Sequence, residues 1–246
     1  MNKIHLMAIG RGAVLEMLRR KDLAVLGLFM TVYLLFLAAA RFVGLETPAA
    51  GTFLLNLSLT LIIALAHLLT LLMAARQIPD ELERRTLYPL MARPVQRAEI
   101  LLGKGLASWA VGLAVFAVLL VPTLLLVPRM EAYVPGTLAQ TLLLQPVALG
   151  MTASIALCIS LLFPRVLAVF LSGLLVFAAG MLVRLPLLAV LSRWLPDPGR
   201  LNLVLRYTDG IGPLSAADFL SLTVSGLLWS GLFLAAACRI FQERSV

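Results

Sequence analysis

Charged residues and catalytic signatures are scarce in this sequence. Only 13% of its 246 residues are charged, against about a quarter in an ordinary soluble domain. It contains no HExxH zinc motif, no GxxxxGK[ST] phosphate loop and no nucleophile elbow. The stretch LLGKG at Leu101–Gly105 lacks both the earlier glycine and the hydroxyl residue of a phosphate loop. The low charge excludes a soluble domain. Because the catalytic and phosphate-binding motifs are missing, we expect that this chain neither catalyses a reaction nor binds ATP.

Cysteine is also rare, and nothing suggests a metal site. Cys158 and Cys238 lie inside apolar runs, without the spacing of a zinc site or a disulfide framework. The net charge of +8 would suggest nucleic acid for a soluble protein. Here the basic residues lie mainly between apolar runs, where they set the topology of a membrane protein. We therefore predict no bound metal, no cofactor on this chain and no nucleic-acid partner.

What the sequence has in quantity is apolar length, with 61% hydrophobic residues and a mean hydropathy of +1.02. Six runs are each about long enough to cross a hydrocarbon core of roughly 30 Å. They are Leu23–Ala40, Thr52–Ala75, Gly105–Val127, Thr137–Phe163, Val166–Val183 and Phe219–Cys238. We predict an all-α integral membrane protein in which residues 1–246 form a single transmembrane domain with six transmembrane helices. Pro164 predicts a tight hairpin between the fourth and fifth helices.

The distribution of lysine and arginine predicts the orientation. If the six helices alternate in direction, six of the 20 basic residues fall on one side of the membrane: Arg41, Arg129, Arg184, Arg193, Arg200 and Arg206. All the others fall on the side that holds both termini and residues 76–104. Because cytoplasmic segments carry the excess of positive charge, we expect a multi-pass protein of a bacterial plasma (inner) membrane with both termini in the cytoplasm.

Residues 1–21 are too polar to cross the membrane. On a helix their apolar side chains gather on one side, and they are Ile4, Met7, Ala8, Val14, Leu15 and Leu18. This pattern favours an amphipathic helix lying in the membrane interface. A solvated leader whose basic residues only fix the topology is the alternative.

Residues 184–218 form short apolar pieces interrupted by proline and glycine. They are predicted either as short re-entrant helices on the exterior side, before the last span, or as an ordinary amphipathic exterior loop. Re-entry is possible only where protein or a water-filled cavity covers the free backbone groups. The sequence leaves both possibilities open.

Two spans carry polar residues on one face: Asn56, Thr60, His67 and Thr70 in the second, and Thr141, Gln145 and Thr152 in the fourth. Such residues either line a pathway or form hydrogen bonds between helices, and we favour the second role. His67 lacks relay partners, which predicts a hydrogen-bonded packing residue. Small residues predict close-packed surfaces in the fifth and sixth spans, namely Gly173, Gly180, Ser225, Gly226, Ser230 and Gly231.

The strongest signal is the charged segment from Arg76 to Lys104, RQIPDELERRTLYPLMARPVQRAEILLGK. Pro79 suits the first position of a helix, and acidic residues after it would complement the helix dipole. We predict a helix that starts at Pro79 and stops before Pro89, because a residue preceding proline avoids helical geometry. Pro94 adds a second break. The segment should form a short, rigid, charged rod beneath the membrane.

This segment resembles that of the ABC-2 type permeases, the membrane subunits of ATP-binding cassette exporters. The likeness rests on an acidic pair, a Thr-Leu, an RPVxR stretch and a closing GK, that is on Glu81, Glu83, Thr86, Leu87, Arg93, Pro94, Arg97, Gly103 and Lys104. Arg85 stands where many members have glycine.

The resemblance implies an ATP-driven exporter whose permease forms the translocation path without doing chemistry. It implies a dimer with a second permease copy or a paralogue, two cytoplasmic ABC ATPase subunits that hold ATP and Mg, and contact with membrane lipids. The loop helix would dock on each ATPase through Pro79, Asp80, Glu81, Glu83, Arg84, Arg85, Thr86, Leu87 and Tyr88, and the segment from Leu185 to Ala217 would form re-entrant helices over the path.

A different class of function is the alternative. Three aspartates, Asp197, Asp209 and Asp218, lie in or beside the exterior segment. They suit a polytopic membrane enzyme or assembly factor that acts on lipid-linked material, although Asp218 could simply stabilise the start of the last span.

Overall fold

The protein is an all-helical bundle, shown here by a computed structural model that describes residues 3–18, 21–42, 48–83, 97–126, 135–182, 196–204, 206, 209 and 211–243. Seven α-helices and one 3-10 helix can be followed through these residues, and no strand occurs among them. They are α1 (Lys3–Leu18), α2 (Lys21–Phe42), α3 (Pro48–Glu83), α5 (Arg97–Leu126), α6 (Pro135–Leu162), α7 (Arg165–Leu182), η1 (Pro198–Leu201) and α10 (Ala216–Glu243).

Each of the six predicted apolar runs falls within one of these helices to within a residue. Within the described ranges, four segments are long and apolar enough to span a membrane: Phe53–Glu83, Arg97–Leu125, Gly136–Leu162 and Ala216–Glu243. The apolar stretches Gly27–Ala39 in α2 and Arg165–Phe177 in α7 are shorter. The all-α membrane class is thus confirmed, with four candidate spans.

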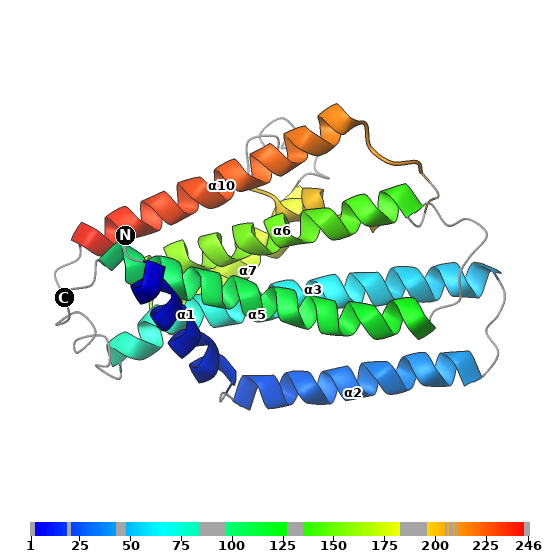
Figure 1. The fold of residues 1–246 in the computed structure, drawn as a ribbon, viewed down its shortest axis with the longest axis horizontal. Helices are drawn as coiled ribbons and strands as arrows, with labels where there is room; N and C mark the ends of the chain where they lie inside the picture. The colour runs from blue at the N-terminus through cyan, green and yellow to red at the C-terminus, as the bar shows by residue number, and fades with distance from the viewer. Residues whose placement is uncertain are drawn as a thin grey trace.

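The helix α6 lies at the centre of the bundle, with α3, α5, α7 and α10 around it (Figure 1). Buried aliphatic residues of α6, such as Ile155 and Leu157, join Ala75 of α3 and Phe241 of α10 in the largest apolar cluster. The helix α2 lies at the edge of the bundle beside α5. Burial of apolar side chains between α6 and its neighbours therefore fixes the arrangement of the helices.

Contacts with α5 hold α2 at this edge. Tyr33 and Leu37 are buried in a second apolar cluster. The Tyr33 hydroxyl also forms a hydrogen bond of 2.7 Å with Thr123 Oγ1. The side of α2 that faces away from the bundle exposes large apolar residues, including Leu28 and Leu35.

The helix α6 ends two residues before Pro164, at Leu162, and α7 begins one residue after it, at Arg165. The Phe163 N–H donates to the Ile159 carbonyl, and the Ala168 N–H donates to the Pro164 carbonyl. The tight hairpin predicted from Pro164 is confirmed, because proline ends one helix and can start the next.

One face of α1 packs on protein, and it differs from the predicted apolar face. Met17 is 2% exposed and clusters with Leu69 and Met73 of α3, whereas Leu15 is 46% exposed. The apolar face predicted for α1 was meant for the membrane interface, and an exposed Leu15 is compatible with it, so the interfacial orientation stays a prediction. The side chains of residues 3–8 and 18 lie outside the described part. Contact with α3 and α5 sets the buried face of α1, and a hydrophobic pattern by itself does not contain that information.

The small residues of the last two spans do not all pack closely. A Cβ atom on Gly226 of α10 would lie 2.6 Å from Val147 Cγ1 of α6 and 3.1 Å from Leu201 Cδ1. In contrast, a Cβ atom on Gly173 or Gly231 would meet nothing within 4 Å. The prediction of close packing is confirmed at Gly226. Gly173 of α7 and Gly231 of α10 meet no neighbour within the described part of this chain, so close packing at these two positions stays a prediction.

We predict that Gly226→Leu destabilises the bundle by about 1–3 kcal/mol, because overpacking forces Val147 and Leu201 to move. Thermal unfolding in detergent micelles measures the effect. Gly231→Leu is the matched control, since it makes the same change on the same helix where the space is open. Equal melting temperatures for the two variants would contradict the close contact between α10 and α6.

Candidate functional site

The charged segment begins inside α3 rather than after it. Pro79 lies within this continuous helix, which runs from Pro48 to Glu83. The predicted start of a separate helix at Pro79 was therefore wrong. A proline inside a helix costs about 3 kcal/mol or more. Burial of this last stretch offsets the cost, because Ile78 is 1% exposed within the main apolar cluster.

The acidic residues consequently lie at the C-terminal end of a helix, where the helix dipole disfavours negative charge. Cations from two other helices compensate. Lys104 of α5 is 3% exposed and pairs with Glu81, whose side chain is 18% exposed. Arg165, the first residue of α7, lies 3.4 Å (Nε to Oδ1) from Asp80.

A third tie joins α5 to α10 at the same end of the bundle. Arg97, the first residue of α5, donates from Nη1 to the carbonyl oxygens of Phe241 and Gln242 at 3.2 and 3.3 Å. A cation is favourable there, because the C-terminal end of a helix carries partial negative charge. We call these five side chains the stem cluster: Asp80, Glu81, Arg97, Lys104 and Arg165. It connects α3, α5, α7 and α10 on either side of residues 84–96.

Gly103, next to Lys104, serves a different neighbour. A Cβ atom at Gly103 would lie 3.0 Å from Ile9 Cγ2 and 3.5 Å from Gly10 N. The absence of a side chain therefore lets α1 approach α5 closely. On the α3 side, Gln77 Nε2 lies 3.8 Å from Met17 Sδ of α1. The final GK of the motif thus has two contacts, with Gly103 against α1 and Lys104 against α3.

The predicted docking residues fall into three groups. Pro79 and Asp80 are buried, and Glu81 faces Lys104 inside the chain. Glu83 is exposed at the end of α3. The remaining loop residues lie outside the described part of the chain: Arg84, Arg85, Thr86, Leu87, Tyr88, Arg93 and Pro94.

Most of the polar residues inside the spans bond within the bundle. His67 Nδ1 of α3 lies 2.8 Å from Thr152 Oγ1 of α6, so the packing role predicted for His67 is confirmed. Thr70, Thr141 and Thr152 each donate to the carbonyl four residues earlier in their own helices. Gln145 of α6 is 1% exposed.

Asn56 and Thr60, which belong to the polar face predicted for the second span, are not buried. Thr60 is exposed and donates to Asn56 Oδ1 at 3.2 Å. Thr60 and His67 line a cavity of ≈ 170 Å³ together with residues of α7 and with Pro198, Gly199 and Asn202 around η1. The segment around η1 therefore reaches the same cavity as the middle of α3.

The segment around η1 is embedded in the bundle. Leu201 and Leu203 belong to the main apolar cluster, and Pro198 is buried. Asp197 accepts a 2.8 Å hydrogen bond from Gly199 N and caps η1. At the start of α10 the Ser215 hydroxyl accepts a hydrogen bond from the Asp218 N–H and lies 2.7 Å from the Asp218 carboxylate, to which it donates. Asp197 and Asp218, two of the three aspartates considered above, thus have structural roles.

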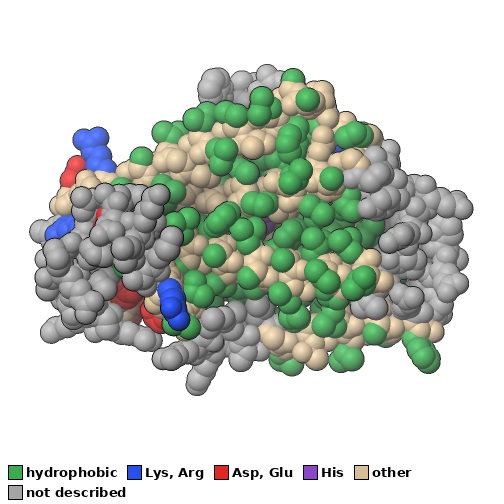
Figure 2. Space-filling view, viewed as in Figure 1, with side chains coloured by type: hydrophobic (Ala, Val, Ile, Leu, Met, Phe, Trp, Pro, Cys, Tyr) green, Lys and Arg blue, Asp and Glu red, His purple; other side chains and the backbone are tan. Residues whose placement is uncertain are grey.

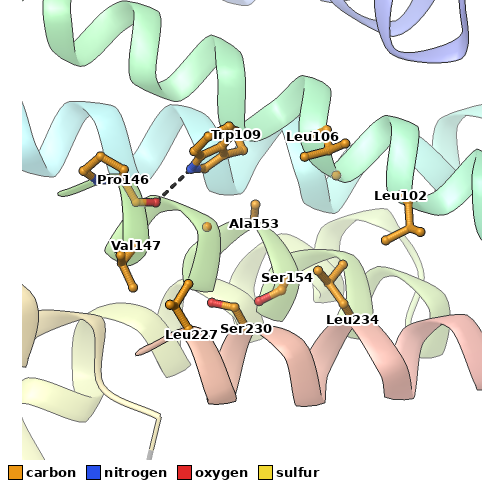
Figure 3. A pocket seen from close by; sticks show the side chains of 12 residues that line it. Leu102, Leu106, Trp109, Pro146, Val147, Ala153, Ser154, Leu227, Ser230 and Leu234 are labelled. Atoms are coloured by element: carbon orange, nitrogen blue, oxygen red, sulfur yellow. Dashed lines mark hydrogen bonds between the residues drawn. The ribbon is translucent and has the colours of Figure 1, made fainter. Parts of the chain in front are cut away.

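Sequence reasoning missed an apolar groove between α5, α6 and α10 (Figure 3). Its volume is ≈ 410 Å³, and its lining includes Leu106, Val147 and Leu234. Trp109 Nε1 donates to the Pro146 carbonyl at 2.8 Å across one end. Small residues at Gly105, Gly150 and Ser154 make the space, and their helical spacing was the available signal.

Apolar side chains cover the middle of the face shown in Figure 2, and the largest charged groups visible there lie at the end of the bundle near α1. Within the described ranges, no group of three or more His, Cys, Asp or Glu could hold a metal ion. The structure therefore defines a helical membrane protein whose most distinctive polar feature is an ionic cluster at one end.

The family comparison specifies the class further. Residues 13–246 match the model of the ABC-2 family transporter proteins, and the chain belongs to this family. A search of curated proteins finds no match. Members of the family are membrane transport components rather than catalytic subunits, so the chain is a transmembrane component of an ABC transporter.

We predict that Thr152→Val destabilises the protein by about 0.6–1.7 kcal/mol, because His67 loses its partner in another helix. Thermal unfolding measures the loss, and Thr152→Ser should avoid most of it. Thr141→Val is the matched control, because Thr141 is also buried in α6 but donates only to its own helix. A loss of the same size at Thr141 would contradict the role of the His67–Thr152 bond.

Proposed function

We propose that this chain is the permease subunit of an ABC-2 type, ATP-driven exporter, and that residues 76–104 couple it to cytoplasmic ATPase subunits. The observation that carries the proposal is the stem cluster. Ion pairs and backbone hydrogen bonds tie both ends of the 84–96 segment to four helices. A loop exposed only to solvent does not need such anchoring, whereas a loop that receives force does.

The proposed topology has six membrane crossings, with α2 and α7 completing the four candidate spans. Consecutive helices run in opposite directions (Figure 1). The start of α5, the α6–α7 hairpin and the end of α10 lie at the same end of the bundle, as the stem cluster requires. This is the basic end of the chain, which the positive-inside rule assigns to the cytoplasm of a bacterial cell.

The docking surface is proposed to lie on Glu83, Arg84, Arg85, Thr86, Leu87 and Tyr88. Glu83 is exposed at the tip of α3. Asp80 and Glu81 are already engaged with cations of this chain, so they are less suited to contact a partner. ATP and Mg would be bound by two ATPase subunits, and Arg93 and Pro94 would lead the chain back to α5.

The proposed translocation path passes the face of α3 that carries Asn56, Thr60 and His67. This face borders the cavity at η1, so the exterior segment can act as a re-entrant cap over it. Thr70, Thr141, Gln145 and Thr152 are almost fully buried within one chain. We therefore assign these four to helix packing rather than to the lining of the path.

The partners within the membrane are proposed to be a second permease copy or paralogue and bilayer lipids. Large apolar side chains are exposed along α2, α7 and α10, such as Leu28, Phe170 and Leu228. Surfaces of this kind must meet lipid or another helix. The alternative, an enzyme acting on lipid-linked material, loses support because Asp197 and Asp218 serve as helix caps.

We predict that Arg84→Glu combined with Arg85→Glu abolishes co-purification of the partner ABC ATPase, because charge reversal opposes docking. Affinity capture from cells that express both proteins measures it. Arg239→Glu is the control, since Arg239 is 83% exposed on α10 at the same end of the bundle. Unchanged co-purification together with unchanged stimulated ATP hydrolysis would refute the docking role.

A further inference from the structure

The two halves of the motif, the acidic pair and the GK, are 23 residues apart in sequence at Glu81 and Lys104, yet they form one ion pair. The pair spans the base of the 84–96 segment, joining the last turn of α3 to the first turns of α5. Any displacement of that segment therefore acts on two helices that are held together by opposite charges.

The pair is set in a nearly closed environment. Lys104 is 3% exposed, and its neighbours in sequence, Gly103 and Gly105, are both buried against other helices. In such surroundings a charge without its partner is strongly unfavourable, whereas an intact pair resists separation. Moving α3 away from α5 would leave the buried Lys104 ammonium without the Glu81 carboxylate. The ion pair therefore resists relative movement of the two helices.

Two further contacts extend the link to the rest of the bundle. Asp80, adjacent to Glu81, pairs with Arg165 at the start of α7. Arg97, two turns before Lys104, holds the C-terminal carbonyls of α10. Movement of the two stems is therefore passed to α7 and α10, which together with α6 contact η1.

We propose that Lys104 is a positioning residue for coupling: by holding Glu81, it makes the ends of the 84–96 segment move as one body with α7 and α10. This inference rests on the proposed function. It assigns Glu81 and Lys104 to transmission within the permease, and it leaves binding of the ATPase to Glu83 and the residues that follow it in sequence.

The experiment compares four variants with the wild type in the complete complex with its ATPase: Lys104→Met, Lys104→Arg, Lys104→Glu, and Glu81→Lys combined with Lys104→Glu. Two quantities are measured, the amount of ATPase captured and the permease-dependent stimulation of ATP hydrolysis. In the isolated permease, spin labels at Glu83 and Phe163 report the distance between the end of α3 and the α6–α7 hairpin, after both native cysteines are replaced by alanine.

Lys104→Met and Lys104→Glu should capture the ATPase normally but lose stimulation by roughly tenfold, because each removes the buried cation that links Glu81 of α3 to α5. The spin-label distance distribution should broaden in both. Lys104→Arg keeps the charge and should retain most of the stimulation. The swapped pair should recover stimulation relative to Lys104→Glu alone. Glu243→Gln, at a carboxylate 71% exposed on α10, is the control and should behave as wild type.

The outcomes separate the two proposals. If Lys104→Met captures the ATPase and keeps both full stimulation and a narrow distance distribution, the positioning role is overturned while the permease assignment stands. Failure of the swapped pair to improve on Lys104→Glu, with Lys104→Arg as impaired as Lys104→Met, also overturns it. If the wild-type permease neither captures nor stimulates the ATPase, the proposed function is refuted. The proposal for Lys104, which rests on that function, is then refuted as well.

Discussion

Charge neutralisation at the end of α3 is the constraint on which the rest of this structure depends. A helix that ends in Asp80, Glu81 and Glu83 places negative charge where its own dipole is negative. Cations must be brought to that point, and the chain supplies them from α5 and α7. Meeting this requirement fixes how α3, α5 and the α6–α7 hairpin meet at the charged end of the bundle.

At the same end of the bundle, three residues near the start of α5 each contact a different helix. Gly103 allows α1 to approach α5, while Lys104 on the next position reaches α3. Arg97 stands at the start of the same helix and holds the end of α10. On both sides of the 84–96 segment, side chains thus contact other helices of the same chain. The proposed coupling relies on these contacts to connect the 84–96 segment to the helices around η1.

Inside the bundle, polar groups are used sparingly. The hydrogen bond between His67 and Thr152 joins α3 to α6, and the threonines near it donate to their own helix backbones. Apolar packing around α6 supplies most of the remaining contacts, and Gly226 lets α10 approach α6 and η1 closely. The segment around η1 is held by this packing and by the Asp197 cap.

The sequence alone determined the class of the protein, because the length and apolarity of its runs follow from composition and bilayer thickness. It also located the helices, the hairpin at Pro164 and the packing role of His67, since each depends on local chemistry. Tertiary structure decided what local rules could not: that α3 continues through Pro79, that Glu81 faces Lys104, and that Gly226 is crowded while Gly231 is open. The physical reason is that each of these depends on a partner distant in sequence, whose burial or charge outweighs the intrinsic preference of the residue itself.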